Sequence, residues 1–316
     1  MAKYDRTDVA GLLQKLGDLL AFLSMAVLYI SMSKFRRNYE ALLDRALPTM
    51  ASLEEKATPS FAKEVNRSLN GARVQFTCTL VLQTCGICGV LIIPFATGDT
   101  FFEFWPPAKD HGLFLAKYAL QVYAFLPCML CIIMYQNAHA VSIAALEAMF
   151  RHLANFIGMI GPDLPAHLSV AKLTRLHSQV LLLAADLNRI FSYYLLTAFW
   201  AGSAIAMASA LRLLVSGVDT RGAITIVVVP VGYFWVCHLG ERLAKASESI
   251  SEAAYFGDWL SLSVPERKMI LFQMQRAHRP ETVVVPFVGA MTLAFFMTTV
   301  NFWYNNVAVL RKIIRS

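Results

Sequence analysis

Six long apolar runs alternate with charged segments along this chain of 316 residues. The runs lie near 12–32, 74–97, 113–136, 190–215, 222–240 and 283–310. A bilayer core of about 30 Å takes roughly 20 helical residues, so these runs suit helices that cross a membrane. The fifth run is short and holds Pro230, a residue that membrane helices tolerate. The pattern predicts an all-α, polytopic membrane helical bundle of six spans.

The basic side chains are concentrated in three of the segments between these runs. Residues 33–73, 138–189 and 241–282 are long and carry most of them. Residues 98–112 and 216–221 are short and hold only Lys109 and Arg221 as bases. The positive-inside rule therefore places the long segments in the cytoplasm. With six spans, both termini are then expected outside, so that the carboxyl terminus is extracellular.

Two stretches of the long cytoplasmic segments are themselves predicted to be helical. In residues 141–157 and 170–191, apolar side chains recur every three or four positions, as they do on one face of a helix. Gly161-Pro162-Asp163-Leu164-Pro165 separates them, and glycine, proline and aspartate together favour a turn. We therefore expect a helical hairpin that continues the spans into the cytoplasm.

The last apolar run carries polar side chains on one face. At 100° per residue, Thr298, Asn301, Asn305, Val309 and Lys312 fall within roughly 80° of one another on a helical wheel. In a membrane helix, such a stripe either lines an aqueous path or holds neighbouring helices together by hydrogen bonds. The pattern alone leaves both interpretations open.

Composition and charge narrow the class of protein. Hydrophobic residues make up 57% of the chain and charged residues only 16%, with a mean hydropathy of +0.53, which excludes a soluble domain of this length. The net charge of +7 follows from the basic cytoplasmic segments, so no nucleic-acid partner is expected. The lipid bilayer is the environment that this composition requires.

The sequence holds no group of residues typical of an enzyme or a metal centre. The seven histidines are scattered, and no phosphate-binding glycine loop or G-x-S-x-G motif is present. Each of the six cysteines lies in an apolar run, which favours reduced thiols that pack as small hydrophobes. Cys85 and Cys88 form a C-x-x-C, but no second Cys or His pair lies near them in the sequence. We expect no enzyme activity, no metal and no cofactor.

The outer halves of the first four runs are rich in aromatic, methionine and small residues. A cavity with this lining suits a small apolar ligand that carries one hydrogen-bonding group. Plain helix packing through small residues accounts for the same composition, so this interpretation also stays open. The candidate ligand-binding residues are Phe22, Met25, Cys88, Leu91, Tyr118, Gln121, Val122, Phe125, Met207 and Ala210.

The segment before the last run has a distinctive order of residues. It contains, in sequence, Ser251, Ala253-Ala254-Tyr255, Trp259, Arg267-Lys268, Met274 and Arg279-Pro280, and the last run adds Tyr304 and Leu310-Arg311. In this order and spacing the chain resembles the insect odorant receptors. The aromatic outer loop at Trp105-Pro106-Pro107 and the long cytoplasmic helical hairpin agree with that family in outline.

The resemblance implies a function and a division of the chain. It implies an odour-specific tuning subunit of a ligand-gated, non-selective cation channel in the plasma membrane of olfactory sensory neurons. This subunit would form a heterotetramer with a shared odorant co-receptor and bind a small volatile organic ligand in the outer half of the bundle. Residues 1–240 would form the ligand-binding bundle with its long cytoplasmic helical loops, 241–282 a cytoplasmic anchor segment and 283–316 a pore-lining last helix.

The resemblance also assigns roles to individual residues. The family's hydrophobic gate falls on Val309, with Ile313 one turn further along the helix. Thr298, Asn301 and Asn305 would then line the pore, which favours the aqueous path over helix association. The residues that would form the anchor are Tyr255, Trp259, Arg267, Lys268, Arg279 and Pro280.

One departure from the family leaves other functions open. The family has seven spans with a cytoplasmic amino terminus, and the run at 12–32 matches its second span. The resemblance therefore predicts that the first span is missing, either through truncation or through loss. A truncated, non-conducting subunit is one alternative. A seven-helix chemoreceptor of the G-protein-coupled type is another, although no D-R-Y or N-P-x-x-Y pattern is present.

Overall fold

The computed structural model describes residues 6–54, 59–97, 110–161, 169–216 and 220–315. Most of these residues are helical, and one short β-hairpin lies between the last two helices. The elements in chain order are α1 (Arg6–Glu54), α2 (Pro59–Thr97), α3 (His111–Gly158), α4 (Val170–Ser216), α5 (Thr220–Phe256), the short 3₁₀ helix η1 (Trp259–Ser261), α6 (Val264–Ala277), β1 (Val284–Val285), β2 (Gly289–Ala290) and α7 (Leu293–Arg315).

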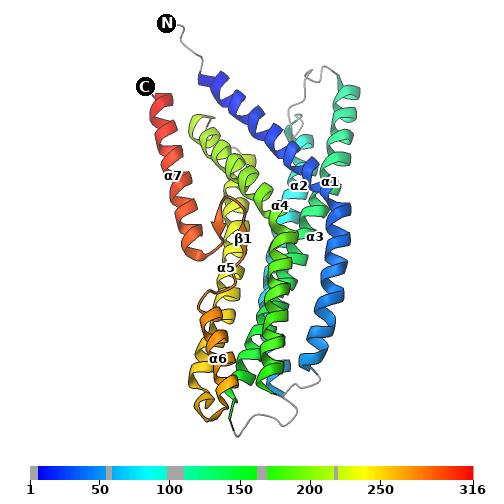
Figure 1. Ribbon diagram of the computed structural model, residues 1–316. Coiled ribbons are helices and arrows are strands. Elements are labelled where there is room, and N and C mark those ends of the chain that lie inside the picture. Colours follow the sequence, from blue (N-terminus) through cyan, green and yellow to red (C-terminus); the bar gives the residue numbers. More distant parts are fainter. Residues whose placement is uncertain (1–5, 55–58, 98–109, 162–168, 217–219, 316) are drawn as a thin grey trace.

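Helices α1 to α5 form an up-and-down bundle, and α7 stands beside it (Figure 1). The start of α1 and the end of α7 lie at the same end of the bundle, and α6 lies at the other end. Among the described residues, α3, Val170–Leu211 and Thr225–Phe256 are long and apolar enough to cross a membrane. The other three predicted spans lie largely within α1, α2 and α7. The predicted all-α membrane bundle is confirmed.

The helices extend well beyond the lengths that a bilayer requires. Residues 141–157 form the second half of α3 and residues 170–191 the first half of α4, as the apolar periodicity predicts. Of the turn between them, only Gly161 lies within the described residues, and its φ of +129° suits glycine. The continuations of the predicted spans thus form a second helical bundle beyond them.

The predicted start of the last helix at 283 is wrong, because α7 begins at Leu293. Residues 283–291 form a small antiparallel hairpin instead, in which Val284 pairs with Ala290 and the Met291 amide donates to the Val283 carbonyl at 2.8 Å. Pro286 lacks the amide hydrogen that a helix interior uses, and Gly289 has a φ of +117°. The apolar content of this segment hid both interruptions from the hydropathy pattern.

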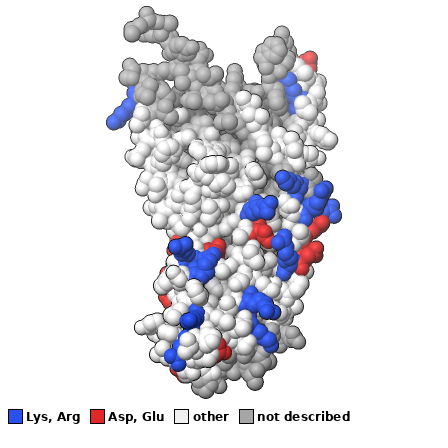
Figure 2. All heavy atoms as spheres, in the orientation of Figure 1, with Lys and Arg blue, Asp and Glu red and all other residues white. Residues whose placement is uncertain are grey.

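Charged side chains gather in the half of the molecule that holds α6 (Figure 2). Above them, on the face shown, the described residues form a band almost without Lys, Arg, Asp and Glu, and a few charged side chains reappear at the upper edges of the molecule. This distribution agrees with a bilayer around the uncharged band and with a water-exposed lower half. The assignment of that half to the cytoplasm stays a prediction from the positive-inside rule.

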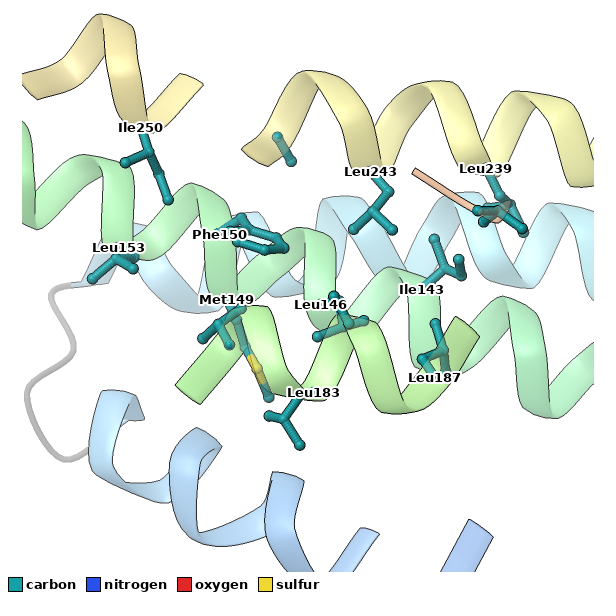
Figure 3. Close-up of a cluster of buried hydrophobic side chains, with 14 of the residues drawn as sticks. Ile143, Leu146, Met149, Phe150, Leu153, Leu183, Leu187, Leu239, Leu243 and Ile250 are labelled. Carbon is teal, nitrogen blue, oxygen red and sulfur yellow. The ribbon is translucent and has the colours of Figure 1, made fainter. Parts of the chain in front are cut away.

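A cluster of buried hydrophobic side chains lies in this lower half, where α3 contacts α4 and α5 (Figure 3). There the hydrophobic effect operates as in a soluble protein, at about 1.5–3 kcal/mol for each large side chain buried. This core therefore contributes much of the driving force that holds the long helices together outside the lipid. Its labelled side chains are Ile143, Leu146, Met149, Phe150, Leu153, Leu183, Leu187, Leu239, Leu243 and Ile250.

His177 makes the stability of this lower bundle sensitive to acid. Burial lowers the pKa of His177 to about 4, and the positive charge of Arg276 acts in the same direction. The unfolded chain takes up this proton near pH 6.5, whereas the folded chain stays neutral until about pH 4. The contribution of His177 to the free energy of unfolding is therefore fully present above pH 6.5, and roughly 3 kcal/mol is lost as the pH falls to about 4.

We expect His177→Gln to remove this part of the acid dependence. The apparent Tm of the purified full chain, measured from pH 7 to pH 4 at one scan rate, should fall less steeply than in the unsubstituted protein. His278→Gln is the matched control, because His278 is exposed at the end of α6. Equal pH profiles for His177→Gln and the unsubstituted chain would contradict the assignment.

Candidate functional site

Helix α7 turns one face toward the bundle and the opposite face away from it. Its packing partners are α4 and α5. Thr299 and Trp303 are buried on the side that meets them. The predicted polar stripe lies on the opposite side, and its exposed members are Thr298, Asn301, Asn305, Val309 and Lys312.

The two asparagines of this stripe have side-chain amides without a hydrogen-bond partner among the described residues of the subunit. Within the described part of the chain, neither Asn301 nor Asn305 makes a side-chain hydrogen bond, whereas Asn306 on the neighbouring face donates to the Phe302 carbonyl at 2.7 Å. In lipid an unsatisfied amide costs several kcal/mol. The stripe therefore requires water or a further polar surface beside it. The side chain of Ile313, the remaining predicted pore residue, lies outside the described residues.

Aromatic contacts connect α7 to the bundle. The ring of Trp303 meets Tyr233 of α5 edge-on at 5.2 Å between centroids, and Phe295 lies 5.7 Å from Phe199 of α4. The Tyr233 hydroxyl donates to the Ala198 carbonyl at 2.9 Å, which ties α5 to α4 at the same level. A displacement of α4 relative to α5 would therefore change the contacts that position α7.

A cavity of about 270 Å³ lies beside these contacts, between α2, α3, α4 and α5. Tyr233 and Phe199 form part of its wall, and Met291 lies at the end nearest the hairpin. Gln83 of α2 donates to Gln136 of α3 at 2.9 Å in the same wall. Apolar walls with a few polar groups suit a small, mostly apolar molecule.

The structure brings together only part of the predicted ligand-binding set. The Tyr118 hydroxyl of α3 donates to the Leu91 carbonyl of α2 at 3.1 Å, and Gln121 and Phe125 are buried below it. Cys88 is exposed instead of facing an interior space. The side chains of Phe22 and Met25 lie outside the described residues. The remaining members are half-buried, namely Val122, Met207 and Ala210.

The described cavity involves residues that the sequence reasoning missed. It lies deeper along α3 than the predicted set, beside Gln136 instead of Gln121. Gln83 and Gln136 are the polar residues of the second and third apolar runs that meet there, and this was the available signal. Nothing in the pattern indicated Tyr233, because a tyrosine in a membrane helix is ordinary.

The predicted anchor residues lie at the α6 end of the molecule, and most of them are exposed. Trp259 packs against the edge of the core, and the Arg267 guanidinium donates to the Leu262 carbonyl at 2.8 Å. Exposed apolar side chains next to them, including Phe256 and Phe272, leave an uncovered hydrophobic surface in a water-facing region. The exposed predicted residues are Tyr255, Lys268, Arg279 and Pro280.

Fold and site together define a multi-pass membrane protein whose last helix presents a polar face away from its own bundle. The family model described as 7tm Odorant receptor matches residues 10–304. The chain belongs to the odorant receptor family of insects.

Individual relatives are distant and cover the chain in part. Odorant receptor 10 of Aedes albopictus is 27% identical over 178 residues, which are 53% of this chain and 46% of the relative. Odorant receptor Or2 of Anopheles gambiae is 26% identical over 211 residues, or 62% of this chain and 56% of the relative. The chain therefore spans about half the length of the relatives that it matches.

Solved structures match over nearly the whole chain. The olfactory receptor OR5 from Machilis hrabei superposes with a TM-score of 0.78 at 16% identity, covering 96% of this chain and 81% of that one. The structure of the same receptor in complex with eugenol gives a TM-score of 0.80 at 15% identity and covers 82% of that chain. At this identity the match establishes the fold.

Proposed function

We propose that this odorant receptor is a subunit of a ligand-gated, non-selective cation channel. It assembles with a shared odorant co-receptor as a heterotetramer in the plasma membrane of olfactory sensory neurons. The α7 helices of the subunits surround the pore, and the exposed surface around Tyr255 and Trp259 forms part of the contact between subunits. A small volatile ligand bound within the bundle opens the pore.

The observation that carries this proposal is the direction of the polar stripe on α7. Asn301 and Asn305 point away from their own bundle and make no hydrogen bond with it among the described residues, which argues against a role in holding this subunit's helices together. Water between several copies of α7 would satisfy their amides. Val309 lies at one edge of the same stripe, one turn beyond Asn305, and is 56% exposed, so a ring of Val309 side chains would form an apolar constriction that closes by excluding water.

The aromatic contacts supply a route from ligand to pore. A ligand shifts the equilibrium between closed and open states only if it binds the open state better. In the predicted outer-half site, or in the cavity walled by Tyr233 and Phe199, a bound molecule would bias the spacing of α4 and α5. Trp303 and Phe295 rest on those two walls, so α7 would follow. The Machilis receptor was solved in complex with eugenol, and this supports a small volatile molecule as the class of ligand.

Val309→Ala tests the gate. Because alanine is smaller than valine by two carbon atoms on each copy, the constriction is wider and dewets less readily, so the current without ligand should rise several-fold. The measurement is whole-cell recording of the chain expressed with an odorant co-receptor, before and during a panel of volatile ligands.

Val307→Ala is the matched control, because Val307 lies on the side of α7 that turns toward the bundle. It should leave the ligand-free current unchanged. Equal currents for the two variants would move the constriction away from Val309. The absence of any ligand-dependent current from the unsubstituted pair would contradict the channel function itself.

A further inference from the structure

A second cavity, of about 440 Å³, opens between α1 and α4 at the level where their apolar runs end. Its size falls within the range of about 300–1,000 Å³ that small-ligand sites occupy. Lys34 lies two residues after the end of the predicted first span, and Arg189 directly precedes the predicted fourth span. Both side chains line the cavity, which therefore lies at one boundary between lipid and water.

The cavity carries an excess of positive charge. Arg45 pairs with Asp186 across it at 2.6 Å. In the described part of the chain no carboxylate pairs with Lys34 or Arg189, although both are exposed and line the same space. Asn38 adds a neutral hydrogen-bonding group. Two unpaired cations and an amide around one hollow suit a phosphate group.

Aromatic rings make the inner wall of this cavity rigid. Tyr135 of α3 stacks on Tyr194 of α4 with 4.9 Å between ring centroids and an interplanar angle of 2°. Phe35 of α1 lies 4.1 Å from Tyr135 and 5.3 Å from Phe191. The hydrogen bonding and charge thus sit at the rim, over a packed aromatic floor that holds α1, α3 and α4 at fixed spacing.

Two apolar tracks lead from the unpaired cations toward the uncharged band. Ile30 and Val27 lie one and two turns beyond Lys34 on the same face of α1, and they are 76% and 51% exposed. Tyr193 lies one turn beyond Arg189 on α4 and is 72% exposed. A free phosphate would use none of this surface, whereas the acyl chains of a phospholipid would cover it.

We propose that the cavity between α1 and α4 binds the phosphate headgroup of an anionic phospholipid, with Lys34 and Arg189 as its cationic contacts and the acyl chains along the two apolar tracks. The lipid belongs to the leaflet on the basic side of the bundle, where juxtamembrane Lys and Arg attract anionic headgroups. It bridges α1 and α4, and this binding does not depend on whether the protein conducts ions.

The experiment measures lipid binding to the purified full chain in neutral detergent. Dioctanoyl phosphatidylinositol is titrated, and its dissociation constant is obtained from the rise in apparent Tm. The double variant Lys34→Ala/Arg189→Ala should bind about thirtyfold more weakly. The control Lys172→Ala/Arg175→Ala removes the same charge from exposed positions of α4 outside the cavity and should change binding by less than about threefold.

Three further measurements make the result decisive. Dioctanoyl phosphatidylcholine and free inositol phosphate should each raise the apparent Tm far less, because the first lacks net charge and the second lacks acyl chains. Lys34→Arg/Arg189→Lys retains both charges and should bind like the unsubstituted chain. This variant tests the role of charge even if the double alanine variant is unstable. Equal weakening in both alanine variants, an equal effect of phosphatidylcholine or of inositol phosphate, or loss of binding in the charge-retaining variant would overturn the proposal.

Discussion

Glu147→Ala is expected to destabilise the lower bundle by roughly 3–5 kcal/mol, the cost of leaving a buried ion pair without one partner. The Glu147 side chain is only 3% exposed. One of its oxygens accepts from Arg242 of α5 at 2.5 Å, and the other lies 3.1 Å from Arg151 of its own helix. Removal of the carboxylate leaves the Arg242 guanidinium uncompensated in a site that excludes most water.

Arg242 also lies close to a third helix. Its guanidinium lies over Gly71 of α2, where an added Cβ would come within 2.0 Å of it. Glu147 therefore joins α3 to α5 and, through Arg242, to α2. The same logic predicts that Glu147→Met/Arg242→Met recovers most of the lost stability, since apolar replacement of a whole buried pair is often close to neutral.

The measurement is the apparent Tm of each purified variant at one scan rate, because membrane proteins commonly unfold irreversibly. Glu40→Ala is the control. It removes a carboxylate from an exposed pair with Arg36 on α1, where solvent screens the interaction, so little change is expected. If Glu147→Ala loses no more stability than Glu40→Ala, or if the double methionine variant is worse than the single one, the account of a buried charge is wrong.

The helical architecture was readable from the sequence because hydropathy reports burial in lipid directly. The runs at 113–136 and 190–215 and the periodic stretches beyond them became α3 and α4. The hairpin before α7 was not readable, since Val284, Val285 and Met291 are as apolar as a span. Only Pro286 and Gly289 interrupt the run, and membrane helices tolerate both residue types.

The polar stripe on α7 and the cavity likewise differed in how far the sequence alone could predict them. The stripe on α7 needs only the period of one helix, so the sequence alone places Asn301, Asn305 and Val309 on one face. The cavity depends on how four helices lean together. Gln83 and Gln136 meet there although 53 positions separate them in the chain, and no single-helix period contains that information.

The backbone of α5 closely approaches the segment just before α7, and Gly240→Ala is expected to disturb this contact. A Cβ added to Gly240 of α5 would lie 2.1 Å from the Met291 carbonyl oxygen and 3.5 Å from the Val283 side chain. Both groups belong to the segment that the 2.8 Å bond from Met291 to Val283 closes. Backbone cannot give way as a long side chain does, so we expect a loss of about 3 kcal/mol and a displaced hairpin.

Gly232→Ala provides the comparison, because it makes the same change two turns away on α5, where nothing lies within 4 Å of the new carbon. That variant should keep or slightly raise the apparent Tm, since alanine is the better helix former by about 1 kcal/mol. A Gly240→Ala chain as stable as Gly232→Ala would show that the approach is not tight. Met291 lies two residues before α7 and on the wall of the cavity. If Gly240→Ala folds and still responds to ligand, but its current without ligand differs from that of the unsubstituted chain, the contact between Gly240 and Met291 sets the resting position of α7.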